Sequence, residues 1–328
     1  MVPIAYGIVR ERETKTVKRY RLIVNPAAGG GSAEQAIPQI ERALEMQRLP
    51  YDIVRTEYPR HAIELAENAA HEGIDIVVSV GGDGTMNEVL NGLMQAKQQR
   101  GVTSALGVLC VGRGNDFAFG VGVSQELDRA CRDLGADVRR TIDVGRVAGG
   151  LFPEGRFFGN GVGIGFDAVV GFEAKKLKRL RGFAGYLVAA LKTIFLFFKA
   201  PLVLMEMDGD KRQMKTLMVS IMNGRRMGGG FMMAPTSASD DGLFDLCVAQ
   251  EVGKLGIFAL IARFMKGTQA SHPAIFTRQA RTVHVTAQAG SLPAHADGET
   301  LCTEGKELCL EILPRQIEVL VHAERGVE

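Results

Sequence analysis

The sequence predicts a two-domain fold: an α/β domain with a parallel, doubly wound sheet, followed by a β-rich domain built as an antiparallel sandwich. Up to about Val147, short apolar runs alternate with segments of helical spacing. Beyond it, short strand-like runs are separated by Asp-Gly turns. The length of 328 residues fits about two domains. We therefore place the first domain at 1–150, the second at 151–313 and, at 314–328, a C-terminal strand that returns to the first domain.

The elements of the first domain follow from its apolar runs, which are short and end at turn residues. The expected strands are 19–24, 51–56, 74–80 and 105–111, and the expected helices are 32–48, 61–72 and 86–96. Three of these strands end in clusters of glycine with Asn, Asp or Ser. Ligands of open α/β sheets bind outside the carboxyl ends of the strands, so we expect the three loops to converge on one crevice.

The second domain has strand-like runs at 157–164, 203–207, 216–222, 243–250, 282–287 and 308–312, with a last apolar stretch at 317–322. One segment, 173–201, breaks this pattern, because a basic first half precedes a nearly apolar second half. Between Glu173 and Lys199 it holds five Lys, two Arg and one Glu, a net charge of +6. The segment is either a core helix with a solvated basic start, or a contact for an anionic membrane surface or an apolar substrate.

Composition excludes several classes of protein. A hydrophobic fraction of 46% and a net charge of +2 exclude a disordered chain and a strongly basic nucleic-acid binder. No apolar run reaches the roughly 18 residues that cross a bilayer. The five cysteines form no CxxC pair, which favours free thiols in a reducing cytoplasm, and the six scattered histidines do not suggest a metal cluster. We expect a cytoplasmic protein that binds no nucleic acid.

Acidic residues set among glycines carry the chemistry. The chain lacks a GxxxxGK(S/T) phosphate loop, a GxGxxG fingerprint, a GxSxG elbow and an HExxH motif. Asp83 follows the most apolar strand in GGDGT, where bare glycines allow a triphosphate to approach and the carboxylate can hold Mg²⁺. Asp241 lies in a turn that suits Mg²⁺, and Asp297 or Glu299 could supply a general base. Taken singly, each Asp-Gly pair is better explained as an ordinary turn.

Five motifs occur together in a fixed order. They are NPAAGG (25–30), VGGDGTMNEVLNG (80–92), GRGNDFA (112–118), APTSASDDGLFD (234–245) and ADGE (296–299). In this combination the chain resembles the bacterial diacylglycerol kinase-like lipid kinases, which share a catalytic domain with diacylglycerol and sphingosine kinases. The GGDGT loop alone also occurs in NAD kinases and phosphofructokinases, so the conjunction carries the resemblance.

The resemblance implies a nucleotide-binding first domain, a lipid-binding second domain, and ATP with Mg²⁺ as cofactors. The implied nucleotide contacts are Asn25, Pro26, Ala27, Ala28, Gly29, Thr56, Gly81, Gly82, Asp83, Gly84, Thr85, Glu88, Gly112 and Arg113. The implied metal positions are Ala238, Asp241 and Leu243, together with Asp116 and Asp143, which with Asp83 would form an acidic network around Mg²⁺ and water. The implied catalytic residues are Asp83, Asp297 and Glu299, and the choice of base between the last two stays open.

One position departs from the family pattern. Where the family usually has Thr in GTGND, this chain has Arg113. A guanidinium can grip a phosphate bidentately instead of donating a hydroxyl, which affects the expected contacts to the nucleotide.

The leading hypothesis is a Mg²⁺-dependent lipid kinase that transfers the γ-phosphate of ATP to a hydroxyl of a diacylglycerol-like lipid. Its expected partners are the lipid and the inner membrane surface, which it would contact peripherally, and a homodimer is left open. Two alternatives are a soluble-substrate kinase of the NAD kinase type and a non-catalytic regulator that binds nucleotide or lipid.

Overall fold

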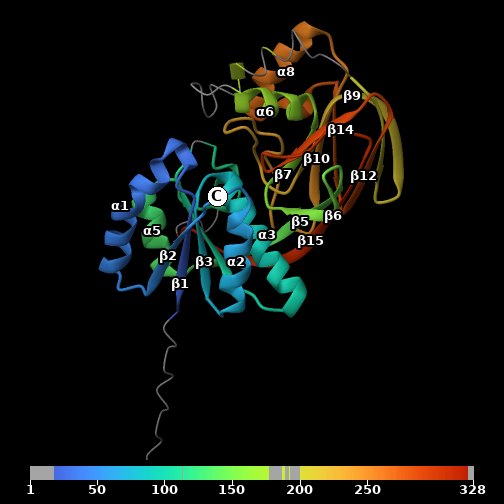
Figure 1. Cartoon of the computed structure of the whole chain (residues 1–328). Helices are drawn as coiled ribbons and strands as arrows, with labels where there is room; N and C mark the ends of the chain where they lie inside the picture. Colours follow the sequence, from blue (N-terminus) through green and yellow to red (C-terminus); the bar gives the residue numbers. More distant parts are fainter. Residues whose placement is uncertain (1–17, 113, 177–186, 189–191, 193–199, 324–328) are drawn as a thin grey trace, which may run out of the picture.

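The computed structural model describes residues 18–112, 114–176, 187–188, 192 and 200–323 (Figure 1). Arg113 and most of the basic-apolar segment 173–201 therefore lie outside the described residues. The chain has an α/β domain with parallel strands and a second, antiparallel β-rich domain, which confirms the predicted fold class.

Four parallel strands form the sheet of the first domain, in the order β2-β1-β3-β4. They are β1 (Tyr20–Val24), β2 (Tyr51–Arg55), β3 (Ile76–Gly81) and β4 (Ala105–Cys110). Helices cover both faces, as expected for a doubly wound sheet. One face packs against α1 (Ser32–Met46) and α5 (Leu127–Ala136), and the other against α2 (His61–His71) and α3 (Asp83–Arg100). Two short helices, η1 (Ala28–Gly30) and α4 (Asp116–Val121), follow β1 and β4.

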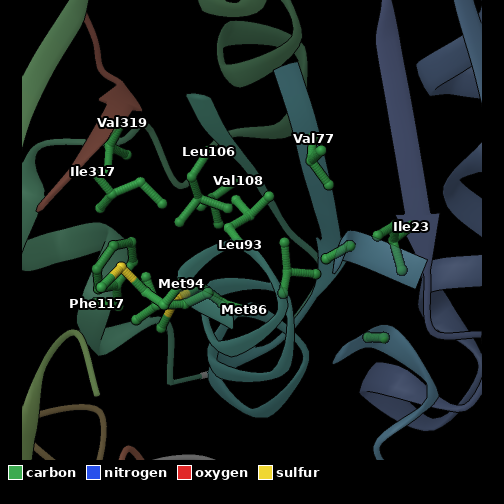
Figure 2. Packing of buried hydrophobic residues seen from close by; sticks show 14 of the residues in the cluster. Ile23, Val77, Met86, Leu93, Met94, Leu106, Val108, Phe117, Ile317 and Val319 are labelled. Atoms are coloured by element: carbon green, nitrogen blue, oxygen red, sulfur yellow. The ribbon is translucent and has the colours of Figure 1, made fainter. Parts of the chain in front are cut away.

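Helix α3 is the central packing element of this domain. Its buried side chains Met86, Leu93 and Met94 face the sheet beside Leu106 of β4 and Phe117 of α4 (Figure 2). The predicted start of this helix at residue 86 is wrong, because α3 begins at Asp83 with Gly82 as its N-cap. An acidic side chain in a first helical turn is favourable, since the amino end of a helix carries partial positive charge. The GGDGT sequence is therefore half loop and half helix.

The last strand joins the two domains. The sequence predicts separate strands at 308–312 and 317–322, but β15 (Glu307–Leu320) is one strand of 14 residues with a register shift between Leu313 and Ile317. It pairs antiparallel with β5 (Arg139–Gly149), and near its end Val319 pairs in parallel with Leu106 of β4. The irregularity includes Arg315, whose φ is 52°. Strand β15 thus belongs to the sheets of both domains.

The second domain consists mainly of antiparallel strands around its own apolar core. The strands are β6 (Phe152–Phe158), β7 (Gly161–Gly165), β8 (Leu202–Met207), β9 (Asp210–Met222), β10 (Phe244–Gln250), β11 (Ile275–Ala280), β12 (Thr282–Ala289), β13 (Leu292–Ala296) and β14 (Glu299–Gly305). The single strand expected at 157–164 is two strands, broken at Gly159 and Asn160. The helices are α6 (Phe166–Lys176), α8 (Lys254–Lys266) and η2 (Gln269–Ser271). No helix within the described ranges is long and apolar enough to cross a membrane.

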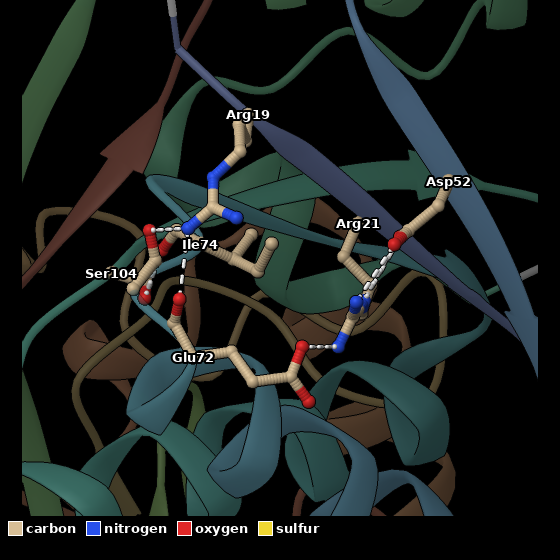
Figure 3. A network of polar contacts seen from close by, with 7 residues as sticks. Arg19, Arg21, Asp52, Glu72, Ile74 and Ser104 are labelled. Atoms are coloured by element: carbon tan, nitrogen blue, oxygen red, sulfur yellow. Dashed lines mark hydrogen bonds and ion pairs between the residues drawn. The ribbon is translucent and has the colours of Figure 1, made fainter.

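Ion pairs and hydrogen bonds link the residues at the amino ends of the first-domain strands (Figure 3). The Arg21 guanidinium bonds Asp52 at 2.7 Å and Glu72 at 2.8 Å. Arg19 donates to the Glu72 and Gly73 carbonyls, each at 2.8 Å, where α2 ends. These contacts hold the turn after α2 at the amino ends of the strands, whereas the glycine loops lie at their carboxyl ends.

Candidate active site

The three glycine loops meet at the carboxyl ends of the strands, as the sequence predicts. Asn25 Nδ2 donates to Thr85 Oγ1 at 3.1 Å, which ties the loop after β1 to the start of α3. Gly29 has a φ of +63°, and a Cβ there would lie 2.9 Å from the Val111 carbonyl oxygen. A Cβ on Gly112 would lie 3.2 Å from the Cα of Gly82. The loops therefore pack backbone against backbone, and a Cβ on Gly82 would meet no atom within 4 Å.

The other expected nucleotide residues are placed around this crevice by local hydrogen bonds. Asn25 Oδ1 accepts the Ala27 N–H at 3.1 Å and shapes the turn that contains Pro26. Ala28 and Gly29 lie in the short helix η1 that follows. The Thr56 N–H donates to the Val24 carbonyl at 2.9 Å, so Thr56 stands at the end of β2. Backbone N–H groups at the carboxyl ends of parallel strands, together with the amino end of α3, form a suitable environment for phosphate.

Glu88 has a structural contact that the sequence did not suggest. Its two carboxylate oxygens accept the backbone N–H groups of Arg60 at 3.1 Å and Ala62 at 3.3 Å, where α2 begins. Burial raises the pKa of Glu88, and these two hydrogen bonds act in the opposite direction. Glu88 therefore fixes α2 against α3, and its expected contact with the nucleotide stays a prediction.

Asp83 and Asp116 form the acidic centre of the crevice. Asp83 Oδ1 accepts the Phe117 N–H at 3.2 Å, and a Cβ on Gly114 would lie 2.8 Å from Asp83 Oδ2. Burial and then the negative charge of Asp116 raise the pKa of Asp83 to about 7, with a further contribution from Asp297. A carboxylate held in this way binds a proton or a cation readily, because either one removes a buried negative charge.

Asp116 is held by the second domain. Arg226 Nε lies 2.8 Å from Asp116 Oδ1, and the Gly229 N–H donates to the same carboxylate at 3.0 Å. Burial raises the pKa of Asp116, while the Gly229 N–H and Arg226 lower it. The loop that carries Arg226 thus brings a cation from the second domain to an acidic residue of the first.

A hydrogen bond joins Asp143 to the turn that holds Asp241. Asp143 is fully buried, and its oxygens accept the Arg315 N–H and the Gly242 N–H, each at 2.7 Å. Asp241 is exposed and accepts the Leu243 N–H at 3.0 Å. The Gly242 N–H thus links Asp143 to the turn that holds Asp241, and the expected role of these two carboxylates around Mg²⁺ stays a prediction.

Asp297 and Glu299 have opposite surroundings. Asp297 is buried at a φ of 46°, and its carboxylate accepts four hydrogen bonds: from Asn87 Nδ2 at 2.9 Å and from the N–H groups of Gly159, Asn160 and Gly161 at 2.8, 3.0 and 2.9 Å. These bonds fill all the acceptor positions of the carboxylate. Glu299 is half-buried, and its Oε1 lies 3.4 Å from the position of a Cβ on Gly84. Glu299 therefore faces the start of α3 across the domain boundary.

Several residues that position this site were missed from the sequence. Asn87 and Asn91 of α3 both donate to the Phe157 carbonyl, at 3.1 and 3.0 Å. Arg156 is buried and donates to Asn87 Oδ1 at 2.6 Å. Burial lowers the pKa of Arg156, and the nearby carboxylate of Glu299 raises it. Asn87 lies in a motif that the sequence singled out, whereas no sequence pattern marks Arg156 or Arg226.

Glycine loops around a pair of carboxylates, facing a carboxylate from an antiparallel second domain, define a two-domain kinase of the GGDGT type. The model of the diacylglycerol kinase catalytic domain matches residues 19–147, and the model of the YegS C-terminal NAD kinase beta sandwich-like domain matches residues 160–321. The chain belongs to the bacterial diacylglycerol kinase-like lipid kinase family.

Individual proteins agree with this assignment. The diacylglycerol kinase of Mycobacterium tuberculosis is 27% identical over 316 residues, covering 96% of this chain and 97% of its own. A crystal structure from Bacillus anthracis str. Sterne, named provisionally as a diacylglycerol kinase, covers 95% of this chain and 99% of its own with a TM-score of 0.76 at 24% identity. An NAD kinase from Archaeoglobus fulgidus in complex with ATP covers 94% and 95% with a TM-score of 0.51 at 16% identity. The two structures establish the likeness of the fold.

Proposed function

We propose that the protein is a Mg²⁺-dependent kinase that transfers the γ-phosphate of ATP to a hydroxyl of a diacylglycerol-like lipid. The observation that carries the proposal is the arrangement of Asp83, Asp116 and Glu299 around glycine loops at the amino end of a long helix. The names of the relatives support the reaction class, and the ATP bound to the NAD kinase neighbour supports the phosphate donor.

The glycine loops are suited to hold the triphosphate. Backbone N–H groups at the ends of β1, β3 and β4, with the first turn of α3, can donate to phosphate oxygens without side chains in the way. The Thr85 hydroxyl lies beside these loops and is held in place by the hydrogen bond from Asn25. Arg113 would add a phosphate contact from the loop after β4.

The oxygen ligands of the crevice fit Mg²⁺. Asp83 and Asp116 offer hard oxygen ligands. Burial and then the negative charge of Asp116 raise the pKa of Asp83, and a divalent cation would balance the negative charge of the two carboxylates. When bound, Mg²⁺ would neutralise charge on the phosphoryl group in transit. The resemblance also implies a second position for a cation, which the exposed Asp241 carboxylate and the backbone carbonyls of Ala238 and Leu243 would hold.

Glu299 is the better candidate for the general base. A base needs an oxygen that can approach the attacking hydroxyl, and the Asp297 carboxylate already accepts four hydrogen bonds. Asp297 instead fixes the turn that leads to Glu299, because it anchors β13 to the Gly159–Gly161 backbone. We assign Glu299 as the proton acceptor and Asp297 as a positioning residue.

The second domain offers a pocket for part of the lipid, lined by apolar side chains together with Lys215, Ser291, Thr303 and Glu304. Its volume is about 780 Å³, within the range of roughly 300–1,000 Å³ typical of ligand pockets. Phe166, Val169 and Phe172 of α6 line one side, and Pro201 and Leu202 lie at the start of β8. The pocket borders the end of the β13–β14 hairpin where Leu292 pairs with Gly305, whereas Glu299 lies at the other end, paired with Ala296, so a bound lipid would have to extend along the hairpin to reach Glu299.

A lipid-substrate screen with labelled ATP and Mg²⁺ in mixed micelles tests the proposal. We expect phosphate on a lipid alcohol, and a loss of about 10²–10⁴ in kcat for Glu299→Gln, the usual contribution of a positioned base. Phosphorylation of NAD without lipid would favour a soluble-substrate kinase. Nucleotide binding without turnover on any substrate, by a folded protein, would favour a regulator.

A further inference from the structure

Helix α8 (Lys254–Lys266) has an exposed apolar face that the proposed reaction does not use. Its inner side chains Ile257, Leu260 and Phe264 are buried in the core of the second domain. On the outer side, Leu255 is 86% exposed, Phe258 37% and Met265 43%. A helix that is apolar on both faces normally lies inside a protein, so the outer face of α8 is expected to be covered by a partner.

The charge around this face is of one sign. Helix α8 contains Lys254, Arg263 and Lys266, and the sequence has no Asp or Glu between residues 252 and 296. The acidic residue before the helix, Glu251, lies 3.6 Å from Lys215 in an ion pair. Apolar side chains flanked by cations are the composition of helices that lie in the interface of anionic membranes, where the cations contact lipid headgroups.

The neighbours of α8 place this face beside the proposed lipid site. Ile261 of α8 and Phe166 of α6 both pack against Val170 of α6, and Phe166 also lines the pocket. Figure 1 shows α6 and α8 together at one end of the second domain. At the other end of α8, the Phe264 carbonyl accepts the Met232 N–H at 2.8 Å. Met232 belongs to the loop that carries Arg226, the partner of Asp116.

We propose that the outer face of α8, defined by Leu255, Met265 and Lys266, docks the protein on an anionic membrane surface. The occupant is a lipid surface rather than a second copy of the chain, because two copies of this basic helix would repel one another. Docking here would bring the cavity beside α6 to the membrane that holds the substrate. The membrane contact is inferred from α8 alone, whereas the delivery of a lipid substrate to the cavity rests on the proposed function.

Sedimentation with vesicles, without nucleotide, tests this surface apart from the kinase reaction. The vesicles are phosphatidylcholine alone, or phosphatidylcholine with phosphatidylglycerol. We expect the wild type to bind the anionic vesicles at low salt, and Leu255→Glu to lose at least about tenfold in partition, since a buried Leu contributes more than that factor. Lys266→Gln should lose about fivefold, because one cation at the surface has roughly that effect.

Met46→Glu is the matched control, because Met46 is also a highly exposed apolar residue (81%) but lies on α1 of the first domain. It should bind the vesicles as the wild type does. The proposal is overturned if Leu255→Glu binds like Met46→Glu, or if binding ignores the anionic lipid. It is also overturned if light scattering shows a dimer that Leu255→Glu dissociates, which would assign the face to a second copy.

A water-dispersed short-chain lipid alcohol separates this result from the proposed function. If Leu255→Glu phosphorylates that substrate at the wild-type rate but loses activity on vesicles, both proposals stand. If neither variant nor wild type phosphorylates any lipid while vesicle binding behaves as expected, the proposed function fails and the docking surface remains.

Discussion

The two ends of the first-domain sheet treat charge differently. At the amino ends, Arg21 is shared between Asp52 and Glu72, and Arg19 caps the carbonyls at the end of α2. At the carboxyl ends, Asp83 lies beside Asp116, and their mutual repulsion adds to the cost of burial. Paired charges stabilise a fold or leave it unaffected, whereas repelling carboxylates destabilise it. The difference indicates that the contacts at the amino ends stabilise the domain, whereas the carboxylates at the carboxyl ends do not, as the proposed ligand site there would require.

The largest effect is expected from Asp83→Asn, which removes the charge repulsion at the carboxyl ends of the strands. In Asp83→Asn, we expect kcat to fall by about 10²–10³, the scale seen when one electrostatic contact to a transition state is lost. Thermal stability near pH 8 should be equal to the wild type or higher, because the buried repulsion with Asp116 is removed. Lipid phosphorylation and a thermal melt measure the two. Activity within tenfold of the wild type would contradict the role given to this carboxylate.

The next effect concerns stability at the domain boundary. Asp297→Ala leaves Asn87 and three backbone N–H groups without their acceptor, so we expect the free energy of unfolding to fall by about 3 kcal/mol or more. Glu299→Ala, which removes a half-buried side chain, should lose less than about 1 kcal/mol. Urea unfolding measures both variants. Equal losses would show that the two carboxylates do not differ as the geometry indicates.

A smaller effect is the pH dependence that Asp83 causes. Its pKa is about 7 in the folded protein, well above the ordinary value of 3.8 for an aspartate in an unfolded chain, so the folded state binds the proton more tightly. Its contribution therefore makes stability fall as pH rises from about 4 to 7, by at most about 1.4 kcal/mol per pH unit. Urea unfolding at pH 5, 6, 7 and 8 should give a flatter profile for Asp83→Asn than for the wild type. Parallel profiles would rule out this titration.

The smallest effect tests the amino ends of the strands. Arg21→Ala removes an ion pair with Asp52 and another with Glu72, both partly exposed, so we expect a loss of only about 1 kcal/mol in unfolding free energy. Kinase activity should stay within twofold of the wild type, because the candidate site lies at the opposite, carboxyl ends of the strands. A tenfold loss of activity in a folded Arg21→Ala protein would remove the contrast between the two ends.

Local patterns predicted much of the first domain. The four strands, the helices on both faces and the convergence of the glycine loops follow from apolar spacing and from where glycines end each strand. The start of α3 at Asp83 was missed, because Gly82 and Gly84 resemble loop residues until the helix is seen to begin between them. In the second domain, α8 was missed, since its apolar content resembles that of a strand region.

The sequence by itself determined the class of fold, the glycine loops at the strand ends and the set of acidic residues, because these depend on residue type and local spacing. Only the tertiary structure decided what each acidic residue does. Asp83 lies beside Asp116. Asp143 accepts hydrogen bonds from the turn of Asp241 and from the bulge at Arg315. Asp297 accepts four hydrogen bonds, whereas Glu299 faces α3. The reason is physical: the role of a carboxylate depends on the donors and charges around it. In this protein those groups come from segments up to about two hundred residues away, such as Asn87 for Asp297.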